Sequence, residues 1–198
     1  MNLPDAAGDG STPLDPDEAE GLIPAHISTR GELNEFESMN IVQGARWLRG
    51  RRPTRETVLT SDFVRQLHRR MFGAVWSWAG EFRHTEKSIG NVPPSEVPVQ
   101  VYEALADAHA QLEGWSFSID EVAMRLHHRL TQIHPFANGN GRTARYFVDE
   151  LLKVEGRPAF TWGTLSERPI QEVRVDYIAA LRAADAGEFD SLRAFVRS

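Results

Sequence analysis

Residues 133–145 of the chain read IHPFANGNGRTAR, and this stretch decides the architecture around it. Pro135 ends a helix that arrives from the N-terminal side, because proline disfavours helical geometry at His134. The ANGNG segment that follows favours a turn, and an apolar helical pattern resumes after Arg142. The sequence therefore predicts a helix, a glycine-rich loop and a second helix that begins near Arg142.

The loop has the residue types of an anion-binding site at a helix N-terminus. Gly139 and Gly141 allow successive backbone amides to turn inward and a phosphate to approach without meeting a β-carbon. Arg142 and Arg145 are three residues apart, so both guanidinium groups can face the same anion. His134 precedes the loop, where a neutral imidazole could accept a proton from a hydroxyl that attacks phosphorus. The pattern favours a phosphoryl or nucleotidyl transfer site over a polar loop with a capping histidine and solvated arginines.

Three other kinds of site fit the stretch less well. It lacks GxxxxGK[ST] of a P-loop and does not have GxGxxG after a strand. His127, His128 and His134 suggest a zinc-dependent hydrolase, but HExxH is absent. His127 and His128 are more typical of a helix surface or core.

Helical periodicity with capping signals extends in both directions from the loop. The polar segment GEFRHTEKSIGNVPP, residues 80–94, predicts a short β-hairpin or flap. The expected fold class is therefore all-α with a minor hairpin. The predicted helices cover residues 29–50, 61–73, 95–114, 118–134, 142–156 and a stretch through Tyr177 to Gly187, and FDSLRAFV adds a final turn or two.

Length and composition restrict the class of protein. The 198 residues, 41% of them hydrophobic, suit one domain over residues 17–198 after a flexible arm over residues 1–16. The absence of cysteine excludes disulfides and cysteine nucleophiles and fits a reducing compartment. Without a signal peptide or an apolar run of about 20 residues, we expect a cytoplasmic protein without a membrane anchor. A net charge of -6 argues against direct nucleic-acid binding.

The segment HPFANGNGRTAR resembles the signature of the Fic family, HPFx[DE]GNGRxxR, at every fixed position except one. The similarity extends to LHRRMFGAVWSWAGEFR upstream and YIAALRAADAGEFDSLRAFV downstream. Through EGLIPAHISTRGELNEFE the chain looks most similar to the subgroup called mobile mystery protein B. The resemblance implies an all-helical bundle with a β-hairpin flap beside an active-site loop at residues 134–145. It also implies a protein adenylyltransferase that uses ATP and Mg²⁺ to transfer AMP to a Ser, Thr or Tyr hydroxyl of a target protein.

The resemblance also implies a role for each matching position. It makes His134 the general base for the target hydroxyl and Phe136 a buried anchor of the loop, which we group with the cofactor-binding residues. The α- and β-phosphates would be cradled by Gly139, Asn140 and Gly141 and contacted by Arg142, and Arg145 would contact the γ-phosphate.

Asn138 is the position that departs from the signature, which has Asp or Glu to hold Mg²⁺. A neutral amide oxygen can ligate a hard cation but gives it no charge. The departure keeps two alternatives open: a nucleotide-binding or interaction module without catalysis, and a Doc-like phosphotransferase. The subgroup resemblance also makes an antitoxin-like regulatory protein a possible partner.

Two further elements follow from the resemblance. A flap at about residues 81–92 would dock a target segment as an added strand through Lys87, Ser88, Ile89 and Gly90; the alternative is an ordinary surface hairpin. An inhibitory helix with the pattern [ST]xxxE[GN] has a partial match in PDEAEG, where Pro16 occupies the Ser/Thr position. We expect Glu20 to pair with Arg145, with Glu32 as a weaker candidate and two exposed acids as the alternative.

Overall fold

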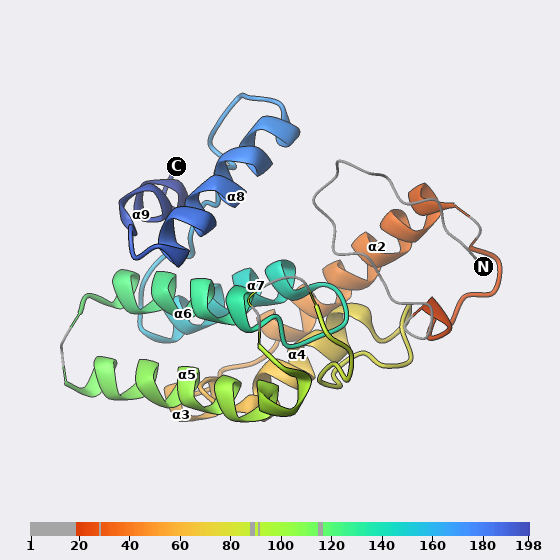
Figure 1. Ribbon diagram of the computed structural model, residues 1–198, viewed down its shortest axis with the longest axis horizontal. Helices are drawn as coiled ribbons and strands as arrows, with labels where there is room; N and C mark the ends of the chain where they lie inside the picture. Colours follow the sequence, from red (N-terminus) through yellow and green to blue (C-terminus); the bar gives the residue numbers. More distant parts are fainter. Residues whose placement is uncertain (1–18, 28, 88–89, 91, 115–116) are drawn as a thin grey trace.

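The computed structural model describes residues 19–27, 29–87, 90, 92–114 and 117–198, so the predicted arm over residues 1–16 lies outside the described residues. Within these ranges the chain is built from helices and contains no strand (Figure 1). One isolated antiparallel bridge joins Leu22 and Trp76. The predicted all-α class is confirmed.

The helices follow the predicted order, with small differences at their ends. The helix after the loop begins at Asn140, before the expected position near Arg142, and the short α3 is not evident from periodicity. No helix in the described ranges has the length and apolar character that a membrane span requires. The elements are α2 Arg30–Arg49, α3 Arg55–Val58, α4 Ser61–Phe72, the 3₁₀ turn η1 Pro94–Glu96, α5 Val97–Glu113, α6 Ile119–Ile133, α7 Asn140–Val154, α8 Ile170–Asp185 and α9 Asp190–Val196.

Local side-chain bonds fix the starts of α2 and α6. At α2 the amide of Glu32 donates to Oγ1 of Thr29 at 3.2 Å, and the amide of Thr29 donates back to the Glu32 carboxylate at 3.0 Å. This is a complete capping box. At α6 the Ser118 hydroxyl accepts from the amide of Glu121, while the Glu121 carboxylate binds Arg125 at 2.7 Å. The reciprocal capping box is therefore complete at α2, whereas only its first half forms at α6.

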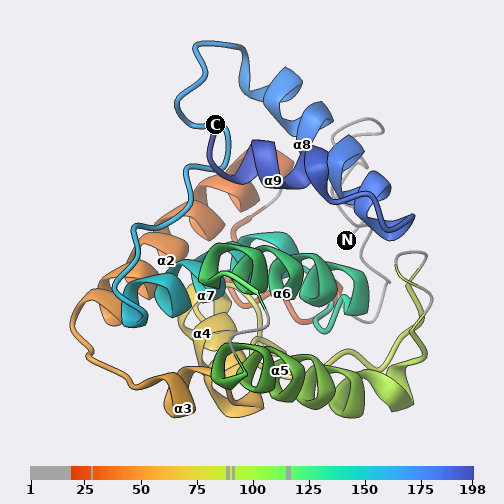
Figure 2. The same ribbon diagram turned by 90° about the vertical axis from the view of Figure 1, so that its left-hand side faces the viewer.

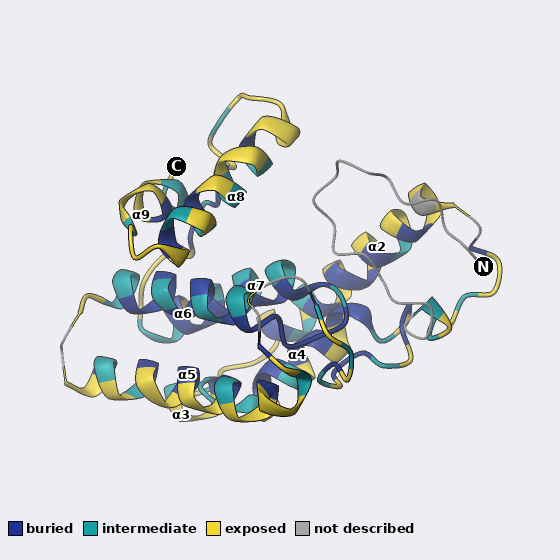
Figure 3. Cartoon of the chain, in the orientation of Figure 1, coloured by how far each residue is buried: buried dark blue, intermediate teal, exposed yellow. Residues whose placement is uncertain are grey.

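The helices pack in layers around a core that supports the loop. Figures 1 and 2 show α5, α6 and the α8–α9 pair as successive layers, and α7 lies beside α6. Figure 3 shows burial concentrated where α4, α6 and α7 meet, and Leu67, Phe147 and Leu151 are fully buried there. Gly44 lets α2 approach α4, since a β-carbon at this position would lie 2.6 Å from Cγ of Met71. Close packing therefore fixes the position of α2 against the core.

The predicted β-hairpin is wrong for the described part of residues 81–92, which contains no strand. The guanidinium of Arg83 instead binds carbonyl groups from both arms of the segment: it donates to Thr85 at 2.8 Å and to Val92 at 2.6 Å. Its Nε also donates to the carbonyl of His134 at 2.7 Å. Arg83 is only 3% exposed, so one buried side chain links the flap to the end of α6.

Candidate active site

His134 terminates α6 in a strained but well-supported conformation. Its φ of 53° places it in the left-handed region, which is uncommon for residues other than glycine although histidine is among those enriched there. Its amide donates to the carbonyl of Leu130 at 3.1 Å, and its own carbonyl accepts from Arg83. The backbone of His134 is therefore fixed by α6 on one side and by the flap on the other.

The ring of His134 is in its neutral form at neutral pH. Burial lowers the pKa of His134 to about 4. A hydrogen bond with the backbone of Thr131 opposes this shift, while the positive charges of Arg83 and Lys87 add to it. A neutral imidazole can accept a proton, so this environment suits a general base.

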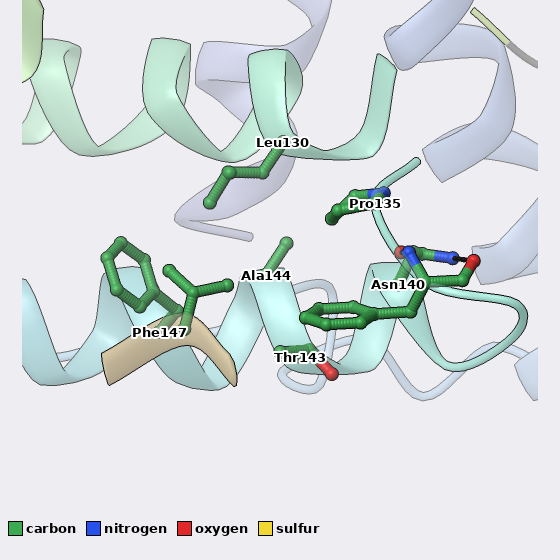
Figure 4. A pocket seen from close by; sticks show the side chains of 8 residues that line it. Leu130, Pro135, Asn140, Thr143, Ala144 and Phe147 are labelled. Atoms are coloured by element: carbon green, nitrogen blue, oxygen red, sulfur yellow. Dashed lines mark hydrogen bonds between the residues drawn. The ribbon is translucent and has the colours of Figure 1, made fainter. Parts of the chain in front are cut away.

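Phe136 and Asn140 hold the loop on the core. The Phe136 ring is fully buried and stacks on the ring of His68 with a centroid distance of 3.8 Å. The Asn140 side chain accepts from the amide of Phe136 and donates to its carbonyl, each at 2.8 Å. Figure 4 shows Pro135, Asn140 and Ala144 around a residual cavity of about 10 Å³, which has space for one water at most. The side chains of Phe136 and Asn140 thus face inward, and a phosphate would meet only their backbone.

His68 of α4 supports the loop from beneath. The amide of Gly80 donates to Nδ1 of His68 at 2.9 Å, so Nε2 carries the proton and donates to the carbonyl of Asn138 at 3.0 Å. Burial lowers the pKa of His68 to about 3, which keeps the ring neutral and this pair of bonds intact.

The N-terminus of α7 forms the base of an anion site. Gly139 is the N-cap with a φ of 79°. The first helical hydrogen bond runs from the amide of Thr143 to the carbonyl of Gly139 at 2.9 Å. The amides of Asn140, Gly141 and Arg142 precede that bond, so they have no acceptor within the helix. These donors and the helix dipole favour a bound anion.

Gly139→Ala tests this loop geometry. A β-carbon at residue 139 would lie 2.6 Å from two ring atoms of the buried Phe72, in a conformation that alanine rarely adopts. We expect the free energy of unfolding, measured by urea denaturation, to fall by about 2–4 kcal/mol. Gly156→Ala is the matched control, because it has a φ of 70° but no atom within 4 Å of the added carbon. Equal losses in the two variants would show that the contact with Phe72 adds no cost.

The two arginines of the loop differ in their contacts. Arg142 forms an ion pair with Glu37 of α2, with 2.7 Å between Nη1 and Oε2. Arg145 donates from Nε to the carbonyl of Gly141 at 3.2 Å and lies over the Tyr177 ring at 5.3 Å. Among the described residues, no carboxylate forms an ion pair with Arg145.

The predicted contact between Glu20 and Arg145 is not formed. Glu20 is exposed, and the next residue, Gly21, accepts from the amide of Ser77 at 2.9 Å. This bond ties the segment to the turn that follows α4. Glu32, the weaker candidate, is used in the capping box of α2.

The flap residues predicted to dock a target are described only in part. Ser88 and Ile89 lie outside the described residues. Lys87 is half-buried and close enough to His134 to influence its pKa. Gly90 packs on the end of α6, where a β-carbon would lie 1.6 Å from the carbonyl oxygen of Gln132. The described part of the flap thus adjoins His134 without forming a strand.

A zinc site does not form from the histidines. His127 is hydrogen-bonded through Nε2 to the Tyr177 hydroxyl at 2.9 Å, and His128 through Nε2 to Asp185 at 2.8 Å. Throughout the described ranges, no three His, Cys, Asp or Glu side chains come together as a metal-binding group. The geometry therefore argues against a zinc-dependent hydrolase.

Three residues that support the site are absent from the predicted set: Glu37, His68 and Arg83. Each is less than 4% exposed and binds the loop or its flanking residues. Glu37 and His68 interrupt the apolar faces of α2 and α4, and a charged or polar residue at such a position is a signal that could have identified them. Arg83 lies in a segment without periodicity and gives no comparable signal.

The helical layers and the loop between α6 and α7 define a protein with the Fic fold. The BepC protein of Bartonella tribocorum, solved with bound AMPPNP, matches with a TM-score of 0.70 at 17% identity, over 91% of this chain and 95% of that one. Fic-1 from C. elegans matches with a TM-score of 0.66 at 26% identity, over 91% of this chain and 51% of that one.

Sequence comparison gives the family. Residues 58–152 match the Fic/DOC family. The protein adenylyltransferase fic-1 of Caenorhabditis briggsae is 34% identical over 143 residues, and the protein adenylyltransferase Fic of Culex quinquefasciatus is 31% identical over 148 residues. Each match covers 70% of this chain but only 26% of the relative, so the chain spans about a quarter of the length of these curated relatives. The chain belongs to the Fic/DOC family.

Proposed function

We propose that the chain is a protein adenylyltransferase that transfers AMP from ATP to a Ser, Thr or Tyr hydroxyl of a target protein. The observation that carries the proposal is the convergence of a neutral His134, free amides at the start of α7, and two arginines on one loop. The adenylyltransferases among the relatives and the AMPPNP in the BepC structure support the same substrate class.

In the proposed reaction the target hydroxyl oxygen attacks the α-phosphorus of ATP. A bond forms between this oxygen and phosphorus, the bond from the α-phosphorus to the bridging oxygen breaks, and pyrophosphate leaves. The hydroxyl proton passes to the ring of His134. The amides of Gly141 and Arg142 and the guanidinium groups of Arg142 and Arg145 stabilise the developing negative charge.

The side chain of Asn138 fits Mg²⁺ that arrives with the nucleotide. Its Oδ1 accepts one bond, from the amide of Gly139 at 2.7 Å, and an amide oxygen has a second lone pair for a hard cation. Asn138 would hold the ion, with phosphate oxygens and waters as the other ligands. A bound Mg²⁺ neutralises phosphate charge; because Asn138 is uncharged, most of the affinity for the ion comes from the nucleotide.

ATP labelled separately at the α- and γ-phosphates tests this proposal. The purified chain is incubated with Mg²⁺, labelled ATP and a bacterial lysate, and proteins are separated under denaturing conditions. We expect covalent α-label on a protein and no γ-label. Covalent γ-label would show phosphate transfer of the Doc type instead. Binding of ATP without either label would show a nucleotide-binding module, the function that the neutral Asn138 favours as second candidate.

The proposal includes a location and a means of control. The reaction needs ATP and a target protein, and the cysteine-free composition suits a reducing compartment, so we place the protein in the cytoplasm. Because the described structure gives Arg145 no carboxylate partner, we propose that an antitoxin-like regulatory protein restrains the activity. Co-purification of such a protein with the tagged chain, and a fall in labelling when it is added back, test this part.

A further inference from the structure

A buried carboxylate from α2 reaches the anion loop. Glu37 is 2% exposed and accepts three hydrogen bonds. The indole of Trp76 donates to Oε1 at 2.8 Å, the side-chain Nδ2 of Asn138 donates to the same oxygen at 3.4 Å, and Arg142 donates to Oε2 at 2.7 Å. Within the described ranges, Glu37 is the acid whose carboxylate binds residues of the loop.

This carboxylate is not needed simply to fill space. Removing a carboxylate from water costs several kcal/mol, and a buried ion pair often contributes no more stability than apolar side chains of similar volume. The neighbours of Glu37 on the same face of α2, Leu33 and Ile41, are apolar. A charged residue between them has its clearest use in the groups that it orients.

Arg142 is the main group that Glu37 orients. Its guanidinium lies 4.8 Å from the centre of the Phe72 ring, and Nη1 donates to Glu37. The side chain is 33% exposed, and no described residue accepts from Nε or Nη2. The ring and the carboxylate thus fix the plane of the guanidinium and leave two of its nitrogens for an anion.

The position of Glu37 suits a permanent support. It lies in the middle of a 20-residue helix that packs on α4, and the indole of Trp76 holds its carboxylate from the core side. An inhibitory contact has to open before the nucleotide enters. Withdrawing Glu37 from the loop would require α2 to leave the core or Glu37 to lose all three donors.

We propose that Glu37 is a positioning residue that supplies from α2 the acidic group that position 138 lacks, and that it holds Arg142 and Asn138 in the phosphate-binding geometry. This inference rests on the proposed function, since the positioned groups are those that bind ATP. In this arrangement the carboxylate that binds the loop residues belongs to Glu37 of α2, a helix outside the loop.

A charge-relocation experiment tests the inference. Binding of AMPPNP with Mg²⁺ is measured by calorimetry for the wild type, Glu37→Gln, Asn138→Asp and the double variant, which has the wild-type net charge. Glutamine keeps a carbonyl oxygen for Trp76 but removes the charge that orients Arg142, so we expect the Kd to rise about tenfold. Asn138→Asp alone places two carboxylates together, and we expect a lower melting temperature. The double variant is expected to bind within about threefold of the wild type.

The control is Glu155→Gln, which removes a carboxylate bound to Arg55 through two bonds of 2.6 Å. It loses an ion pair without touching the loop, and we expect the Kd to stay unchanged. An unchanged Kd in Glu37→Gln would show a purely structural role, a lower Kd would show an inhibitory role, and failure of the double variant to recover would exclude charge relocation; each overturns the inference.

The same experiment separates the inference from the proposed function. If the wild type binds AMPPNP and the variants show the expected changes in Kd, but the wild type transfers no label from ATP, the adenylyltransferase proposal alone is overturned. A wild type that transfers label but shows no coupling between residues 37 and 138 overturns the inference alone. A wild type that does not bind AMPPNP overturns both.

Discussion

Replacing His134 by asparagine is expected to lower the rate of AMP transfer by about 10²–10⁴-fold, the usual contribution of a positioned general base. The neutral ring, with its pKa lowered to about 4, is the proton acceptor in the proposed reaction, and an amide cannot take over that proton. The loop amides and arginines remain in place. We therefore expect AMPPNP to bind nearly as well as to the wild type, so that the loss appears in kcat.

The choice of asparagine controls for the backbone. His134 has a φ of 53°, and asparagine tolerates the left-handed region better than alanine does. His134→Ala is expected to lose the same activity and to melt at a lower temperature than His134→Asn. Label transfer by His134→Asn within a few-fold of the wild-type rate would contradict the role of this ring as the base.

Lowering the pH from 7 to 5 is expected to reduce the free energy of unfolding by about 4–5 kcal/mol. Burial lowers the pKa of His68 and His127 to about 3 and that of His134 to about 4, against about 6.5 in the unfolded chain. The unfolded state therefore binds more protons between these values, and stability falls as the pH drops through about 6.5. Each histidine contributes about 2 kcal/mol of the loss at pH 5.

Asp149 acts in the opposite direction. Burial raises its pKa to about 6, so the folded state binds this proton more readily and gains about 1 kcal/mol on acidification to pH 5. Urea denaturation at pH 7, 6 and 5 measures the sum of these effects. His127→Gln is expected to remove the contribution of one histidine, about 2 kcal/mol, from the loss of unfolding free energy between pH 7 and pH 5. A stability that stays level between pH 7 and pH 5 would contradict the buried, neutral state of the three histidines.

The sequence predicts helices well where apolar spacing and caps are local. Thr29 and Glu32 are three residues apart, so the start of α2 needs no information from elsewhere in the chain. The predicted start of α7 lies later than the observed one because Gly139 adopts the left-handed conformation and serves as the N-cap. The helix therefore begins at Asn140, although the apolar pattern is visible only further on.

The parts of the site that could not be predicted depend on contacts between distant segments. Glu37 and Arg142 are separated by 105 residues, and periodicity cannot show which residue lies opposite a buried acid. The same limit explains the flap. Its polar, glycine-containing sequence favours a hairpin, but the side chain of Arg83 binds the carbonyls of Thr85 and Val92 in place of a strand ladder.

The two hydrogen bonds between the side chain of Asn140 and the backbone of Phe136 also affect the motion of the loop. The loop closes on itself through two side-chain bonds and is anchored by a fully buried ring, so we expect it to have no separate low-energy opening. We expect exchange of the Phe136 amide hydrogen with solvent to require separation of α4, α6 and α7, which is global unfolding. We therefore expect the anion site to persist for as long as the native state itself.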